Sequence, residues 1–259
     1  MYDLPAVRTA TDAWWRGLAR HLRATGIDDV PAALARTPAP DWTDPDLLFS
    51  QTCGYPLTHV LAGQVVPICT PAYRAPGCNG AWYASALVVR EDSDAAGLRD
   101  LGGYTCAINA RDSHSGCNVL RRMIAPLADG EAFFSAVVET GGHVASIDSI
   151  ARGLADLCAV DAVTHELMRR HTPAQLTGTR ILEYSPRAPG LPYIAGPAVT
   201  AADRARMRDA MFAALDDPGL AETRDALLIT GAEEVSRETY AIITAMENEA
   251  IALGYPRLE

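Results

Sequence analysis

Lysine is absent from this sequence, and all 22 residues counted as lysine or arginine are arginine. The absence excludes a pyridoxal phosphate Schiff base, a lysine-dependent aldolase and a Walker A loop, because each needs an ε-amine. Since replacement of lysine by arginine also accompanies GC-rich codon usage, it indicates no particular function by itself.

Long apolar runs are missing as well. No segment approaches the roughly 18 apolar residues of a transmembrane helix. The nearly uncharged stretch 50–89 has Arg74 as its single formal charge. Its glutamines and prolines exclude a membrane helix, and we expect buried strands and loops there. The start, Met-Tyr-Asp-Leu-Pro-Ala-Val-Arg, has neither the basic nor the apolar region of a secretory signal. We therefore expect no membrane span.

Positive charge is scarce. The 22 arginines face 32 acidic residues, which gives a formal net charge of −10 and a pI near 5.0. This balance excludes the basic surface that nucleic acids and acidic membranes require. The 259 residues, 49% hydrophobic and 21% charged, fit a globular protein of one or two domains.

Cysteine motifs for metal or redox chemistry are also missing. The six cysteines, at positions 53, 69, 78, 106, 117 and 158, form no Cys-x-x-Cys pair. We expect free, mostly buried thiols and neither a metal nor a cofactor. In an oxidising compartment, the best candidates for a disulfide are Cys53 or Cys69 with Cys78.

Hydrophobic periodicity predicts helices alternating with strands. Helices are expected at 6–25, 57–62, 117–127, 132–137, 146–152, 162–171, 200–216, 219–229 and 236–253. Strands are expected at 46–50, 65–70, 85–90, 105–109, 138–140, 156–160, 180–184 and 192–195. The alternation predicts an α/β fold with largely parallel sheets.

The sharpest local motif is Asp112-Ser113-His114-Ser115-Gly116, between a predicted strand and a predicted helix. Backbone N–H groups at a helix start, two hydroxyls and a glycine that permits close approach suit an oxyanion such as phosphate, phosphonate or sulfonate. An ordinary helix cap formed by Asp112 or Ser113 explains the same residues.

Two more strand ends carry polar residues. The loop 141–146 places His143 where it can donate to an anion or bind a metal, or where it is a surface residue of a capping loop. Asp161 ends the apolar strand 157–160, at the edge where open α/β sheets bind ligands, or it caps the next helix. No Gly-x-Ser-x-Gly or Gly-x-Gly-x-x-Gly motif is present, and we assign no catalytic residue.

Three strings together resemble the phosphonate/phosphate-type substrate-binding proteins of ABC transporters. They are Asp-Ser-His-Ser-Gly at 112–116, Thr-Gly-Gly-His-Val-Ala-Ser-Ile at 140–147 and Gly-Leu-Ala-Asp-Leu-Cys-Ala-Val-Asp at 153–161. The resemblance extends over nearly the whole chain, through Ser-Gln-Thr-Cys-Gly-Tyr-Pro at 50–56 and Leu-Pro-Tyr-Ile at 191–194.

The resemblance implies an α/β fold of the type II periplasmic-binding-protein kind, with two lobes, a central cleft and two hinge crossings. Lobe one would comprise residues 1–90 and 190–259, and lobe two residues 91–189. The implied function is non-enzymatic capture of a small phosphonate-like or phosphate-like oxyanion for transport, with an ABC transporter permease as the partner.

The resemblance also implies the site residues. Ser113, His114 and Ser115 would hold the anion's oxygens, His143 would donate from the neighbouring helix, and Asp161 would accept from a protonated or amino-bearing ligand. From lobe one, Thr52, Tyr55 and His59 would face the cleft, with Tyr2 and Tyr193 as weaker candidates.

Some positions depart from the family pattern. His114 stands where a small hydroxyl residue is usual, Gly142 where serine is frequent, and His59 where phosphonate binders tend to have tyrosine. These departures leave the identity of the anion open.

Two other functions fit the same two-lobed fold. The chain could be a cytoplasmic lyase or transferase that uses His114, His143 and Asp161 as acid and base, or a sensor whose closed form binds a partner. The family resemblance implies a periplasmic protein, whereas the missing signal, if the start is genuine, implies a cytoplasmic one.

Overall fold

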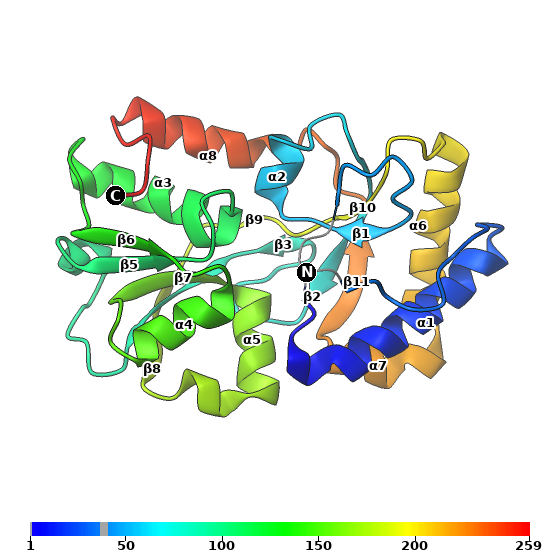
Figure 1. The fold of residues 1–259 in the computed structure, drawn as a ribbon, viewed down its shortest axis with the longest axis horizontal. Coiled ribbons are helices and arrows are strands. Elements are labelled where there is room, and N and C mark those ends of the chain that lie inside the picture. Colours follow the sequence, from blue (N-terminus) through cyan, green and yellow to red (C-terminus); the bar gives the residue numbers. More distant parts are fainter. Residues whose placement is uncertain (1, 37–40) are drawn as a thin grey trace. The chain divides into compact units, whose positions relative to one another are not determined.

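The computed structural model describes residues 2–36 and 41–259, whose elements are drawn in Figure 1. The chain divides into two compact units. Unit 1 comprises Met1–Arg74, Asn79–Ala81 and Pro189–Arg237, and unit 2 comprises Ala75–Cys78, Trp82–Ala188 and Glu238–Glu259.

The sheet of unit 1 is antiparallel throughout and has the order β1-β10-β2-β11. Its strands are β1 (Ser50–Gln51), β2 (Val66–Tyr73), β10 (Tyr193–Ala195) and β11 (Ile229–Glu233). The helices of the unit are η1 (Pro5–Val7), α1 (Arg8–Ala24), α2 (Gly54–Thr58), α6 (Ala201–Asp216), η5 (Pro218–Leu220) and α7 (Ala221–Ala226).

Helix α1 packs against α6 through its apolar face. Trp14, Leu18 and Leu22 recur at helical spacing and are buried, as the sequence pattern predicts. Gly17 lies under Leu220, whose side chain would be only 2.5 Å from a Cβ at this position. The missing side chain therefore lets η5 pack closely on α1.

Unit 2 contains a five-stranded mixed sheet of order β6-β5-β7-β4-β8. Its strands are β4 (Ser85–Arg90), β5 (Thr105–Ile108), β6 (Ala136–Glu139), β7 (Leu157–Asp161) and β8 (Thr179–Tyr184), and the short β3 (Trp82–Tyr83) pairs with β9 (Ala188–Pro189). The helices are η2 (Leu98–Leu101), η3 (His114–Asn118), α3 (Val119–Ala128), α4 (His143–Ala151), α5 (Ala162–His171), η4 (Pro173–Leu176) and α8 (Ala241–Ala252).

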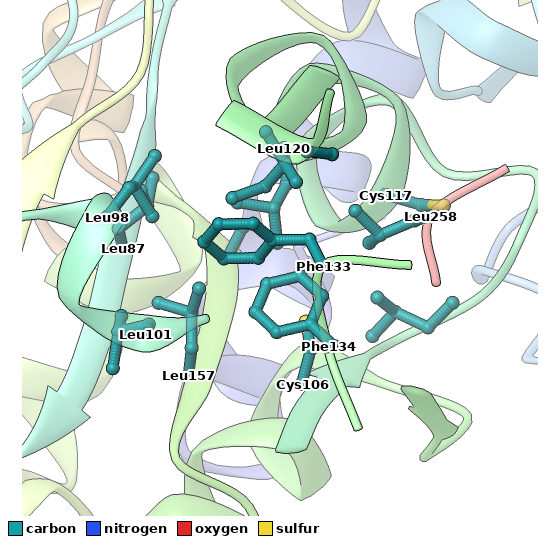
Figure 2. Packing of buried hydrophobic residues seen from close by; sticks show 14 of the residues in the cluster. Leu87, Leu98, Leu101, Cys106, Cys117, Leu120, Phe133, Phe134, Leu157 and Leu258 are labelled. Atoms are coloured by element: carbon teal, nitrogen blue, oxygen red, sulfur yellow. The ribbon is translucent and has the colours of Figure 1, made fainter. Parts of the chain in front are cut away.

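The core of unit 2 lies between this sheet and its helices. Figure 2 shows the neighbouring rings of Phe133 and Phe134, whose centroids are 5.0 Å apart, among leucine and cysteine side chains. Strands β4 and β7 are buried almost along their whole length, which accounts for their nearly unbroken apolar sequences.

Two segments account for most of the difference between the units and the expected lobes. Strand β4 belongs to unit 2 because it pairs with β7 and β8 in the same sheet. The C-terminal segment Glu238–Glu259 also belongs to unit 2, because α8 packs against α3. The expected lobes placed both segments in lobe one.

The prediction of largely parallel sheets is wrong. Within unit 2, β5 runs parallel to β6 and β7, but β4 is antiparallel to both of its neighbours, and all strand pairs of the unit 1 sheet are antiparallel. An apolar run indicates that a strand is buried, but it contains no information on the direction of its neighbours.

The helix predictions for 132–137 and 219–229 also fail. The segment 132–137 is not helical, because the N–H groups of Phe133 and Phe134 donate to the Glu259 carbonyl instead of to a preceding helical turn. The segment 219–229 contains the short η5 and α7 and then begins β11, since Leu228 takes a left-handed conformation with φ 62°.

All six cysteines are free thiols, and five of them are buried. Among residues 2–36 and 41–259, no helix combines the length and the apolar character that crossing a bilayer requires.

Candidate functional site

Three polar loops of unit 2 follow parallel strands. Strand β5 pairs in parallel with β6, where Ile108 lies opposite Glu139, and with β7, where Ala107 lies opposite Cys158. Because carboxyl ends of parallel strands meet at one edge of a sheet, the N-termini of η3, α4 and α5 gather at that edge (Figure 1). This is the place where the sequence predicted Ser113, His143 and Asp161.

The first loop opens a π-helical turn. Ser113 caps it, because its Oγ accepts a hydrogen bond from the Gly116 N–H at 3.1 Å. The five-residue turn η3 then continues into α3. Ser113, His114 and Ser115 are all buried. The structure therefore shows the ordinary cap and also places the predicted anion-binding side chains together, at a type of turn that is frequent at functional sites.

Gly116 is required here by close packing. A Cβ at this position would lie 1.7 Å from Asn109 Oδ1 and 3.3 Å from His143 Cε1. The Asn109 Oδ1 atom is buried and forms no hydrogen bond within the described part of the chain. The sequence reasoning did not select Asn109, although a polar residue at the end of the predicted strand 105–109 was the available signal.

Ser115 and His143 form a hydrogen-bonded pair across the first two loops, with 3.0 Å between Oγ and Nε2. His143 is half-buried and begins α4, whose N-cap Gly142 offers no side chain to the first-turn N–H groups. Burial lowers the pKa of His143 to about 4, and a backbone interaction with Ala159 offsets part of this shift. His143 is therefore neutral at physiological pH.

His114 is also held neutral. Its ring is almost fully buried, and its centroid lies 6.2 Å from that of Tyr83. Burial lowers the pKa of His114 to about 3. Both histidines of the site thus act as neutral hydrogen-bonding groups rather than as cations.

Asp161 caps the helix that follows it. Its Oδ1 accepts hydrogen bonds from the N–H groups of Val163 at 2.8 Å and Thr164 at 3.1 Å. Asp161 therefore caps the next helix, which is one of the two roles that the sequence predicted for it. The same buried carboxylate stands at the carboxyl end of β7, so a role in ligand binding stays a prediction.

The remaining predicted residues lie in unit 1. Thr52 is fully buried, and its N–H donates to the Pro192 carbonyl at 3.2 Å. The rings of Tyr55 and His59 stack with centroids 3.9 Å apart, and His59 Nδ1 lies 2.9 Å from the Tyr55 carbonyl oxygen. That Thr52, Tyr55 and His59 meet the same ligand as the unit 2 residues stays a prediction.

The weaker candidates of unit 1 have aromatic neighbours. The ring of Tyr2 packs edge-on against Tyr73 at 5.0 Å, and the ring of Tyr193 lies 4.8 Å from that of Phe49. These contacts pack both rings, and a role of Tyr2 or Tyr193 in ligand binding stays a prediction.

Unit 2 also contains a cavity of about 460 Å³. Its lining residues are Arg111, Cys117, Arg121, Pro256, Arg257, Leu258 and Glu259. None of the predicted site residues lines it, so the sheet edge and its three helix starts, rather than this cavity, define the candidate site.

Residues 44–240 match the family described as ABC transporter, phosphonate, periplasmic substrate-binding protein. The chain belongs to this family. The resemblance stated from the sequence is thereby confirmed. Members of this phosphonate-binding family are substrate-binding transport proteins and not enzymes, which leaves the lyase or transferase alternative without support.

Solved structures show the same fold. A binding protein component of an ABC phosphonate transporter from Pseudomonas aeruginosa is 16% identical, with a TM-score of 0.73 over 93% of this chain and 82% of that one. PhnD1 from Prochlorococcus marinus, in complex with methylphosphonate, is 14% identical, with a TM-score of 0.70 over 93% of each chain.

A third similar structure is a Xanthomonas citri protein bound to chloride ion, 17% identical, with a TM-score of 0.65 over 91% of this chain and 89% of that one. At these identities the similarity establishes the fold, an α/β periplasmic-binding-protein fold of two units. No curated protein sequence matches the chain.

Proposed function

We propose that this phosphonate-family protein captures a small oxyanion with a tetrahedral phosphorus centre, a phosphonate or phosphate, and delivers it to an ABC transporter permease. The observation that carries the proposal is the cluster of neutral donors at the sheet edge of unit 2. The Ser113–Ser115 turn and the paired His143 lie at the starts of two helices.

Neutral donors suit this task. Helix N-termini carry a partial positive charge and point backbone N–H groups at a bound anion. The predicted site residues include no arginine, so binding would rely on hydrogen-bond geometry, which distinguishes oxyanions by shape. The net charge of −10 does not attract anions over long range, and the local dipoles must therefore supply the affinity.

The double variant Ser113→Ala with Ser115→Ala tests the proposal. We expect methylphosphonate and phosphate binding, measured by isothermal titration calorimetry, to weaken by about a hundredfold or more, because each of the two lost charge-assisted hydrogen bonds costs about 1.5–3 kcal/mol. Loss of the Ser113 cap should lower the free energy of unfolding by about 1 kcal/mol, measured separately by denaturation.

Ser149→Ala is the matched control. Ser149 lies on α4 of the same unit, and its hydroxyl donates to the Ala145 carbonyl of its own helix. We expect this variant to bind as the wild type does. Wild-type affinity in the double variant would show that the serines do not hold the anion.

A further inference from the structure

Asn118 lies one helical turn after His114 and is almost fully buried. Two contacts fix the orientation of its amide. Arg121 Nη2 donates to Oδ1 at 2.6 Å, and Nδ2 donates to the Ile243 carbonyl at 3.0 Å. Because a guanidinium only donates and a carbonyl only accepts, a flipped amide would break both hydrogen bonds.

The fixed amide determines where His114 carries its proton. Asn118 Nδ2 lies 3.3 Å from His114 Nδ1, and an NH₂ group can only donate there. His114 Nδ1 must therefore present its lone pair. Since the buried ring is neutral, its single proton sits on Nε2.

The contacts continue beyond Asn118. Arg121 Nη2 lies 2.9 Å from Glu247 Oε1, and Arg121 Nη1 donates to the Pro256 carbonyl at 2.8 Å. Helix α8 thus supplies both the carboxylate that holds Arg121 and the Ile243 carbonyl that holds Asn118. The Arg121 side chain and the Ile243 carbonyl together hold the Asn118 amide in one orientation.

We propose that Asn118 is a positioning residue that keeps His114 as a neutral imidazole protonated on Nε2, so that His114 is a fixed N–H donor for the bound anion. The role of His114 as a donor to the anion rests on the proposed function. A small hydroxyl residue, usual at this position in the family, can rotate its proton toward a ligand. An imidazole cannot, and it needs a neighbour that selects the correct tautomer.

The experiment is long-range ¹H–¹⁵N NMR of the full chain labelled with ¹⁵N-histidine, with the His114 signals assigned from His114→Gln. We expect the wild type to show the Nε2–H tautomer at pH 7, both alone and with saturating methylphosphonate. Asn118→Asp replaces the donor with an acceptor of the same shape, and we expect the His114 proton to move to Nδ1. Methylphosphonate affinity should then fall about tenfold or more.

Asn248→Asp is the control, because it makes the same change at an exposed position of α8. It should leave both the tautomer and the affinity unchanged. A wild-type His114 protonated on Nδ1 would overturn the inference, and that result does not depend on whether Asn118→Asp folds. A shifted tautomer with unchanged affinity would overturn the donor role. If the wild type binds no phosphorus oxyanion, the proposed function fails, while the tautomer result still tests Asn118.

Discussion

Gly116 sets the geometry of the candidate site at the scale of single residues. Its backbone passes so close to Asn109 and His143 that a methyl group would have to displace the asparagine. We expect Gly116→Ala to lower the free energy of unfolding by about 1–3 kcal/mol, as in other overpacked sites. Methylphosphonate binding, measured by calorimetry, should be lost because Asn109 and His143 move.

Gly142→Ala provides the comparison for this variant. Gly142 precedes His143, its φ of −177° suits any residue, and a Cβ there meets nothing within 4 Å. This second alanine should cost less stability than Gly116→Ala, since only the N-cap preference for glycine over alanine is lost, and it should leave methylphosphonate binding unchanged. Equal binding by the two alanine variants would show that close packing at Gly116 does not shape the site.

The sequence predicted that Gly116 permits a ligand to approach the backbone, and it did not predict that Asn109 and His143 lie against this glycine. The motif Asp-Ser-His-Ser-Gly identifies a flexible position at a helix start, whereas the contact with Asn109 joins residues from different loops. In the same way, the sequence named both Ser115 and His143 but did not predict their hydrogen bond. Such contacts depend on the register of β5 against β6, which local patterns do not contain.

At the scale of elements, Asp161 connects β7 to α5. Asp161→Ala removes the acceptor of two buried N–H groups, and we expect the free energy of unfolding to fall by about 1–2 kcal/mol. Asp161→Asn keeps a capping oxygen and should cost much less. Urea denaturation of the two variants measures the difference, and equal losses would contradict the capping role.

The asparagine variant also separates capping from ligand binding. If Asp161→Asn keeps its stability but loses affinity for aminoethylphosphonate, the carboxylate charge serves the ligand. If Asp161→Asn keeps both its stability and its affinity, Asp161 serves only as a helix cap.

Elements with local signals were predicted well. The helix expected at 162–171 is α5 and the strand expected at 85–90 is β4, and Thr200 caps α6 as the pattern of Thr200 and Asp203 predicts. The helix prediction for 132–137 failed because tertiary hydrogen bonds to the Glu259 carbonyl outweigh the local preference for a helix. The prediction of largely parallel sheets failed because the direction of a strand pair depends on which strands become neighbours.

At the scale of the whole molecule, the buried histidines predict how stability depends on pH. The pKa of His114 is lowered to about 3 and that of His143 to about 4, against about 6.5 in an unfolded chain. The unfolded chain therefore binds protons first, and stability should fall as the pH drops below about 6.5. His114 alone should cost about 2 kcal/mol between pH 6.5 and 5.

Denaturation curves between pH 7 and 5 measure this slope, and His114→Gln should flatten it. The pKa of Asp217 is lowered to about 2, mainly by a hydrogen bond from His21. Asp217 therefore loses its stabilising contribution only as the pH falls below about 4, outside the range from pH 7 to 5. A slope that is unchanged in His114→Gln would show that His114 is not held neutral in the folded protein.

The sequence could name residues of both units, since Thr52, Tyr55 and His59 belong to unit 1 and Ser113 to Ser115 to unit 2. The family strings give the order of these residues along the chain and nothing about the distances between them. Whether these residues bind one ligand together is therefore tested best by measuring ligand binding to the whole chain.

The most direct test of the account is a thermal-shift series on the wild-type chain with methylphosphonate, aminoethylphosphonate, phosphate, phosphite, sulfate, taurine and acetate. A ligand present at 100 times its dissociation constant adds about 2.7 kcal/mol to the free energy of unfolding. We predict a clear rise in Tm with at least one phosphorus oxyanion and no comparable rise with acetate. No rise with any phosphorus compound, or a rise only with taurine or acetate, would contradict the proposed function.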